Sequence, residues 1–125
     1  MNNEIVTKDA PAAIGPYSQG IGAGEFCFVS GQLPTNPVTG VIESENIKDQ
    51  ANQALKNVEA VLKEGGFTLG DVVKTTCFIA DMSLFSDFNE VYSKFFTGVC
   101  PARSCFAVKG LPKNALCEIE VIAHK

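Results

Sequence analysis

Between Asn46 and Glu64 the chain repeats apolar residues at helical spacing, and this segment most strongly limits the folds open to it. The apolar residues fall at i, i+4, i+7, i+8, i+11, i+14 and i+15: Ile47, Ala51, Ala54, Leu55, Val58, Val61 and Leu62. Gly65 and Gly66 then end the pattern. The spacing predicts an amphipathic helix, and its single apolar stripe must be buried against another layer.

That second layer is expected to be a sheet, because most of the remaining chain has strand-like composition. Residues 71–80 are rich in β-branched side chains, and a turn at Gly24-Glu25 separates two strands before the helix. A second amphipathic helix is predicted over 84–97. The expected strands are 4–7, 17–24, 26–31, 71–80, 103–109 and 116–123. The order β-β-β-α-β-α-β-β predicts a single α+β domain over residues 1–125, with two helices on one face of a mixed sheet.

Alternation along the last two strands divides their side chains between the two faces of the sheet. In the first strand, Ser104, Phe106 and Val108 lie opposite to Arg103, Cys105, Ala107 and Lys109. In the second, Cys117, Ile119 and Val121 lie opposite to Glu118, Glu120 and Ile122. The side chains that we expect to meet the helices are Phe106, Val108, Ile119 and Val121. Arg103, Cys105 and Glu118 would then project together from the other face.

The face away from the helices is also expected to be apolar. Residues 26–30 and 72–80 carry apolar side chains on both sides, whereas two helices can cover only one side. An exposed apolar face implies cover by another protein surface, and a second copy of the chain is the simplest one. We therefore predict an oligomer whose sheets pack together, with Arg103 and Glu118 near the seam.

Charge and hydropathy narrow the classes of partner. The 125 residues carry a formal net charge of −4, and the ten Lys and Arg residues are scattered. A nucleic-acid partner is disfavoured, because such proteins usually present a basic face. The N-terminal residues lack the apolar core of a signal peptide, and no run approaches the roughly 20 apolar residues of a membrane span. We expect a cytoplasmic protein with no membrane partner.

Five cysteines without a Cys-x-x-Cys pair predict reduced thiols and no metal site. The single histidine, His124, stands one residue from the end, so a Cys-His catalytic pair is not expected either. Cys105 is interpreted as a pocket-wall residue, and the neighbouring Arg103 is expected to lower its pKa.

Arg103 is the strongest candidate for a ligand-binding residue. Its guanidinium stays charged and presents a planar fork of donors that suits a carboxylate, although many arginines only form structural ion pairs. Glu118 and Glu120 point the same way, and either carboxylate can position or deprotonate a water. Alternation alone does not choose between the two glutamates. A pocket with one cation and one carboxylate would orient a small polar molecule.

Six segments carry a combined signature along nearly the whole chain. They are APAAIGPYSQG (10–20), VSGQLPTNPVTG (29–40), VVKTTCFIADM (72–82), FNEVYSKFF (88–96), PARSCFAV (101–108) and CEIEVIA (117–123). Together these segments resemble the RidA/YjgF family of reactive-intermediate deaminases. The combination of GPY-S-Q, PAR-S-C and E-I-E is far more specific than any single short motif.

The resemblance implies a chorismate-mutase-like fold and a homotrimer with active sites between its subunits. It also implies hydrolysis of the imine or enamine forms of 2-iminobutanoate and 2-iminopropanoate to 2-oxo acids and ammonia, with no cofactor. The family's carboxylate-binding arginine corresponds to Arg103, and its water-positioning glutamate to Glu118. The pocket residues that it implies are Tyr17, Ser30, Gly31, Asn89 and Cys105, with the Cys105 backbone at the nitrogen end of the substrate.

Two other functions remain as alternatives. Endoribonuclease activity and inhibition of translation are also attributed to members of this family, but the acidic composition, the absence of basic runs and the lack of a histidine for acid–base cleavage argue against RNA cleavage. A ligand-sensing regulatory trimer would use the same Arg103 pocket for binding alone. The sequence does not separate this role from catalysis.

Overall fold

The computed structural model describes residues 2–125 as a six-stranded sheet with two α-helices. The strands are β1 (Asn3–Ile5), β2 (Gly20–Ala23), β3 (Phe26–Gln32), β4 (Val72–Ile79), β5 (Ala102–Ala107) and β6 (Cys117–His124). The helices are α1 (Ile47–Glu64) and α2 (Phe85–Phe95), and three short 3-10 turns cover Leu69–Asp71, Met82–Leu84 and Pro112–Asn114. The predicted order of strands and helices is confirmed.

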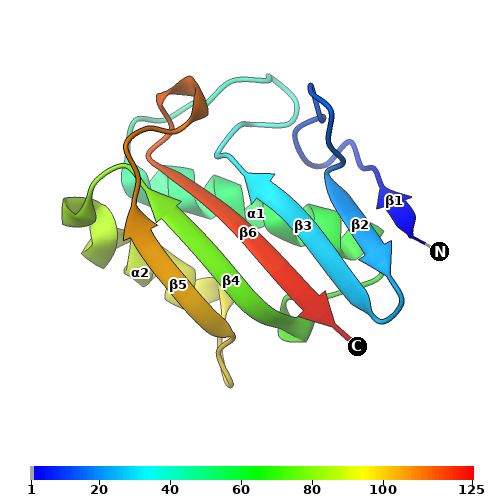
Figure 1. Ribbon diagram of the computed structural model, residues 1–125. Coiled ribbons are helices and arrows are strands. Elements are labelled where there is room, and N and C mark those ends of the chain that lie inside the picture. Colours follow the sequence, from blue (N-terminus) through cyan, green and yellow to red (C-terminus); the bar gives the residue numbers. More distant parts are fainter. Residues whose placement is uncertain (1) are drawn as a thin grey trace.

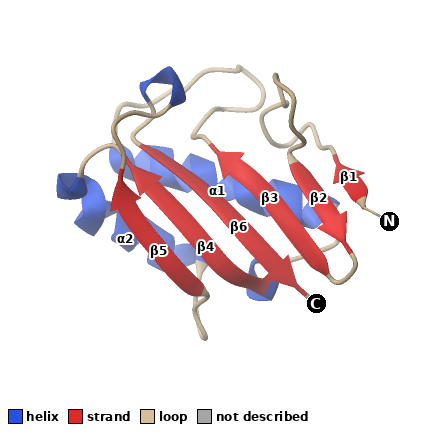
Figure 2. Cartoon of the chain, viewed as in Figure 1, coloured by secondary structure: helices blue, strands red, loops and turns tan. Residues whose placement is uncertain are grey.

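The sheet has the strand order β1-β2-β3-β6-β4-β5. β4 and β5 run parallel, and all other neighbouring pairs are antiparallel. Both helices lie on the same face of the sheet (Figure 1), and the other face carries no helix from residues 2–125 (Figure 2). The predicted α+β fold with a mixed sheet is therefore correct.

Helix α1 packs the predicted apolar stripe against the sheet. All seven predicted apolar residues are buried, and Asn46 caps the helix by accepting hydrogen bonds from the N–H groups of Lys48 and Asp49. Buried polar residues on the same helix hold loops: Asn57 Nδ2 donates to the carbonyls of Leu33 and Thr35 at 2.9 Å. Neither α1 nor any other helix within residues 2–125 has the length and hydropathy needed to cross a membrane.

One predicted strand begins later than expected. Residues 17–19 form a loop, and β2 begins only at Gly20. The buried side chain of Gln19 holds this loop, because its Nε2 donates to the carbonyls of Thr7, Ala10 and Pro11 and its Oε1 accepts from the Thr7 N–H. Here the Gln19 side chain bonds backbone groups that would otherwise pair with a strand. A single residue of this kind produces no periodic pattern in the sequence, so the later start of β2 could not be predicted.

The predicted faces are correct for β6 and wrong for β5. In β6, Ile119 and Val121 are buried on the helix side. In β5, however, Arg103 pairs with Thr75 and Cys105 with Cys77, and both β4 partners are fully buried beneath the helices. Register partners on adjacent strands share a face, so Arg103 and Cys105 face the helices.

Phe106 consequently lies on the open face, and not beneath the helices as predicted. It is 46% exposed and meets the ring of Phe78 edge-on, with centroids 5.4 Å apart. The apolar side chain of Phe106 was assigned to the helix side because apolar residues are usually buried. β5 is an edge strand that α2 covers only in part, so this expectation fails there. Val108, which was also assigned to the helix side, lies beyond the end of β5.

The open face carries exposed apolar side chains, as the sequence indicated, beside the carboxyl groups of Glu118 and Glu120. Phe26 and Phe28 are 42% and 44% exposed, and Phe28 lies beside its register partner Ile122. Exposed aromatic groups on β3 and β5, with the half-buried Phe78 of β4 beside Phe106, form a larger apolar surface than isolated surface residues do. The oligomer predicted from this face remains a prediction.

Candidate functional site

The predicted site residues form two groups on opposite faces of the sheet. The first, called the arginine cluster, contains the predicted residues Asn89, Arg103 and Cys105 together with Phe85 and Tyr92, which were not predicted, and it lies on α2 and β5 on the helix side. The second, called the glutamate cluster, contains Tyr17, Ser30, Gly31 and Glu118, around β3 and β6. The prediction that Arg103, Cys105 and Glu118 share one face is wrong, because β5 presents its odd-numbered residues to the helices.

Arg103 is held by α2 in the arginine cluster. Its Nη1 donates to Asn89 Oδ1 at 2.6 Å. Its Cζ lies 4.7 Å from the ring centroid of Tyr92 and 5.5 Å from that of Phe85. These α2 residues occupy positions i, i+4 and i+7, which place them on one side of a helix. The guanidinium is therefore fixed by a hydrogen bond and by aromatic contacts.

The Arg103 charge has no carboxylate partner within residues 2–125. The ion pairs there join Lys48 to Glu90 and His124 to Glu25. Arg103 is half-buried, it is the only arginine in the sequence, and it lines a cavity of about 300 Å³ with Asn89 and Tyr92. A guanidinium has five N–H donors. The arrangement thus leaves donors that can bind an anion.

Cys105 lies beside Arg103 but is not an activated thiol. Burial raises its pKa, and the Arg103 charge opposes this rise without reversing it. The predicted effect of Arg103 is therefore present, but burial outweighs it and the Cys105 pKa is raised. Its register neighbour Cys77 is more deeply buried, and desolvation raises the pKa of that thiol to about 12. A raised pKa makes both thiols poor nucleophiles, because the thiolate is the reactive form.

Glu118 dominates the glutamate cluster. Its carboxyl is half-buried on the open face, where desolvation, followed by the charge of Glu120, raises its pKa above the ordinary value of 4.5. The side chain lies against Gly31, where an added Cβ would overlap Glu118 Oε2. Gly31 lies within the irregular stretch of β3 between Val29 and Gln32. The absence of a side chain at residue 31 thus makes room for the carboxylate.

Tyr17 and Ser30 lie near this carboxylate through the loop before β2. The Ser30 hydroxyl donates to the Ser18 carbonyl at 2.6 Å, and the Ser30 N–H donates to the Gln19 carbonyl at 3.0 Å. Tyr17 is half exposed and lines a narrow cavity of about 70 Å³ with Gly31. The structure therefore brings Tyr17, Ser30, Gly31 and Glu118 into one region.

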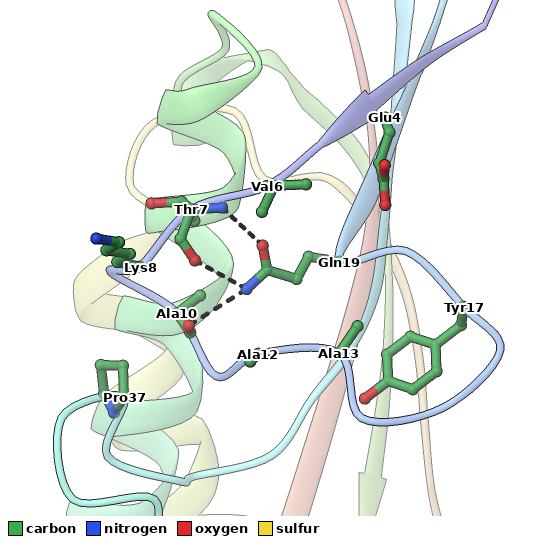
Figure 3. Close-up of a pocket in the computed structure, with 10 residues that line it drawn as sticks. All are labelled: Glu4, Val6, Thr7, Lys8, Ala10, Ala12, Ala13, Tyr17, Gln19 and Pro37. Atoms are coloured by element: carbon green, nitrogen blue, oxygen red, sulfur yellow. Dashed lines mark hydrogen bonds between the residues drawn. The ribbon is translucent and has the colours of Figure 1, made fainter.

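A larger cavity of about 540 Å³ lies beside the same loop. Figure 3 shows Tyr17 at its edge and Gln19 in its wall, with the Gln19 amide bonded to the backbone of Thr7 and Ala10. Neither Arg103 nor Glu118 lines this cavity. A site chosen by cavity volume alone would therefore lack Arg103 and Glu118, the ionisable groups that can bind an anion or activate a water.

Comparison with known proteins now places the chain in a family. A family model described as Endoribonuclease L-PSP matches residues 7–125. The chain belongs to the RidA/YjgF family. The resemblance read from the six sequence segments is thus confirmed.

The RidA/YjgF relatives carry several names. A RutC family protein of Pyrococcus horikoshii is 48% identical, over 100% of this chain and 99% of its own. The 2-iminobutanoate/2-iminopropanoate deaminase of Salmonella typhimurium is 46% identical, over 98% of each chain. The crystal structure of E. coli TdcF with bound serine matches with a TM-score of 0.94 and 44% identity, and the match covers 98% of both chains.

Sequence reasoning missed three residues that hold the arginine in this RidA/YjgF chain. Phe85 and Tyr92 were assigned to an apolar helix stripe, yet both contact the guanidinium. Thr75, in β4, is hydrogen-bonded to the Tyr92 hydroxyl at 2.8 Å. The spacing of Phe85, Asn89 and Tyr92 was the available signal, but an aromatic stripe in a helix is more often plain core.

Proposed function

We propose that this protein hydrolyses small 2-imino acids, such as 2-iminobutanoate and 2-iminopropanoate, to 2-oxo acids and ammonia. The observation that carries the proposal is the Arg103 guanidinium, which lies in a cavity with no carboxylate partner among residues 2–125. The name of the Salmonella relative, which is 46% identical, supports this substrate class. Such substrates carry a carboxylate next to the reactive C=N carbon, and a planar donor fork binds that carboxylate well.

In this proposal Arg103 binds the substrate carboxylate and thereby orients the C=N carbon. Asn89 accepts one N–H of the guanidinium and leaves the others for the substrate. Cys105 forms part of the wall, and its backbone faces the nitrogen end of the substrate. The serine bound to TdcF supports a ligand of this size, because serine also carries a carboxylate beside a carbon–nitrogen bond.

Glu118 positions and deprotonates the attacking water. The oxygen of the water bonds to the C=N carbon while a proton passes to the Glu118 carboxylate. With a protonated imine this addition gives a carbinolamine, whose nitrogen takes the proton back from Glu118. The C–N bond then breaks and the nitrogen leaves as ammonia with the bonding electron pair, while the hydroxyl group gives its proton to the Glu118 carboxylate and becomes the carbonyl of the 2-oxo acid. A pKa raised above 4.5 improves Glu118 as a base, since a carboxylate of higher pKa holds a proton more strongly.

Both clusters must meet for this chemistry, so we propose a homotrimer with sites between subunits. Within one chain Arg103 and Glu118 project from opposite faces, which prevents them from contacting one substrate. Because β5 is an edge strand of the sheet, a neighbouring copy that packs against the open face and extends around this edge would bring its glutamate cluster to the arginine cluster. The exposed aromatic rings of Phe28 and Phe106 support such packing.

The direct test generates 2-iminobutanoate with a threonine dehydratase and follows release of the 2-oxo acid. We expect wild type to accelerate release and Arg103→Ala to lose nearly all of the acceleration. Lys109→Ala removes an exposed positive charge just beyond β5 and is the matched control, which should behave as wild type. An Arg103→Ala variant as fast as wild type would contradict the proposal.

The other functions give different outcomes in the same experiment. A regulatory protein would bind 2-oxobutanoate through Arg103 without turning over the imine. An endoribonuclease would cleave RNA after extensive purification. The geometry disfavours RNA cleavage, because the single histidine, His124, pairs with Glu25 beside the β2–β3 turn.

A further inference from the structure

The Arg103 guanidinium lies against aromatic rings that are themselves rigidly held. Tyr92 is 7% exposed, and its ring packs on Phe96 with centroids 4.7 Å apart. Its hydroxyl is hydrogen-bonded to Thr75 Oγ1 at 2.8 Å, and Thr75 is fully buried. With both ends fixed, the Tyr92 ring cannot swing away from the arginine.

The register of the sheet explains why this ring meets Arg103. Thr75 in β4 is the register partner of Arg103 in β5, and both project toward α2. A tyrosine of α2 that bonds Thr75 therefore brings its ring against the neighbouring Arg103 side chain, where Cζ lies 4.7 Å from the ring centroid. Phe85 approaches the same guanidinium at 5.5 Å.

We propose that Tyr92 and Phe85 are positioning residues, whose rings fix the plane of the Arg103 guanidinium so that its free N–H donors face a ligand carboxylate. The inference rests on the proposed function of Arg103 as the carboxylate-binding group. Bidentate binding requires the guanidinium and the carboxylate to be coplanar. The hydrogen bond to Asn89 fixes only the Nη1 atom of Arg103, and the guanidinium could still rotate about that hydrogen bond. The rings remove this freedom, and cation–π attraction holds the cation in place.

The rings act through Arg103, so their loss should raise KM for the imine more than it lowers kcat. We expect Tyr92→Leu to lower kcat/KM roughly tenfold, the order of one cation–π contact in a partly desolvated site. Tyr92→Phe keeps the ring and loses only the hydroxyl. It should keep KM close to wild type even though the protein is less stable. A purely structural role for Tyr92 predicts lower stability in both variants and an unchanged KM.

Phe85→Leu provides a second variant in case Tyr92→Leu does not fold. Phe85 is only half-buried, and its ring is farther from the cation, so a KM rise of roughly threefold is expected. A wild-type KM in the folded Tyr92→Leu protein overturns the proposal. An equal rise in KM for Tyr92→Phe and Tyr92→Leu also overturns the proposal, because the lost hydroxyl, and not the lost ring, would then explain the rise. If only Phe85→Leu folds, a wild-type KM in that variant overturns it.

A spectroscopic readout separates this inference from the proposed function. Arg103 is the only arginine, so its side-chain N–H signal in ¹⁵N-arginine-labelled protein needs no assignment. Ring currents should shift this signal upfield in wild type and in Tyr92→Phe but not in Tyr92→Leu. If wild type fails to hydrolyse imines, the proposed function fails, and this signal together with a titration of 2-oxobutanoate still tests the positioning. If wild type is active and the signal is unchanged by Tyr92→Leu, only the positioning fails.

Discussion

Arg103 and Glu118 lie on opposite faces of one sheet, with β4 between their strands. Arg103 projects toward α2, where it bonds Asn89, whereas Glu118 lies on the open face against Gly31. One chain therefore presents the proposed carboxylate-binding group on one side and the proposed water-activating group on the other. Assembly of several copies is the simplest way to bring such groups to one substrate.

The open face should be required for activity as well as for assembly. Phe28→Glu places a charge on a strand face that we expect to be buried between copies, so we expect a shift toward the 13.3 kDa monomer and loss of imine hydrolysis. Sedimentation velocity measures the shift toward monomer, and release of the 2-oxo acid measures the loss of hydrolysis. Val38→Glu, at a loop residue 91% exposed, is the matched control and should do neither. A monomeric wild type would refute the intersubunit site.

The charge of Arg103 should be sensitive to Asn89. Asn89→Asp puts a carboxylate at the position that now accepts from Arg103 Nη1 at 2.6 Å, so an internal ion pair would compete with the substrate. Asn89→Ala removes the hydrogen bond but leaves the cation free. We expect Asn89→Asp to raise KM more than Asn89→Ala, by roughly a further tenfold, since paired charges bind external anions less well. Equal KM values would show that the Arg103 charge does not bind the substrate.

Activity should rise with pH through the pKa of Glu118. The carboxylate, and not the carboxylic acid, accepts the proton of water, and desolvation and Glu120 raise the Glu118 pKa above 4.5. The acid limb of kcat/KM should therefore have its inflection above that value. Glu120→Gln removes one cause of the rise, so the inflection should move to lower pH. If the inflection of kcat/KM against pH does not move in Glu120→Gln, a group other than Glu118 produces the acid limb.

Gly31 should be necessary for the position of the Glu118 carboxylate. A Cβ at residue 31 overlaps the flexible end of that side chain, so Gly31→Ala should displace the carboxylate with little effect on folding. We expect kcat to fall roughly tenfold or more, because small errors in the position of a catalytic group are costly. Gly22→Ala is a control in a neighbouring strand, where the nearest atoms lie 3.9 Å from the added Cβ. Thermal denaturation checks that both variants fold.

The hydrogen bond between Thr75 and Tyr92 should show strong coupling in a double-mutant cycle. Tyr92→Phe leaves the buried Thr75 hydroxyl without its 2.8 Å partner, which should cost about 1–3 kcal/mol of unfolding free energy. Adding Thr75→Val removes the unpaired hydroxyl, so the double variant should recover part of that loss. Urea denaturation of the four proteins measures the coupling. Simple additivity would show that the bond contributes little.

The sequence by itself determined the class of fold. The α1 stripe, the β-branched residues of β4 and the order of elements predicted two helices on one face of a mixed sheet, because local periodicity reports which residues need burial. The motifs determined the family for the same chain. They also named Asn89, Arg103 and Glu118, whose roles remain predictions.

Only the tertiary structure decided which face Arg103 occupies and what holds it there. Alternation along β5 gives two faces but does not say which one a helix covers, and the exposed Phe106 made the wrong face look buried. The register of β5 against β4, set by hydrogen bonds between distant segments, resolved this. The contacts of Tyr92 with Thr75 and Arg103 arise in the same way. Such contacts join three separate elements, so no pattern within one element contains them.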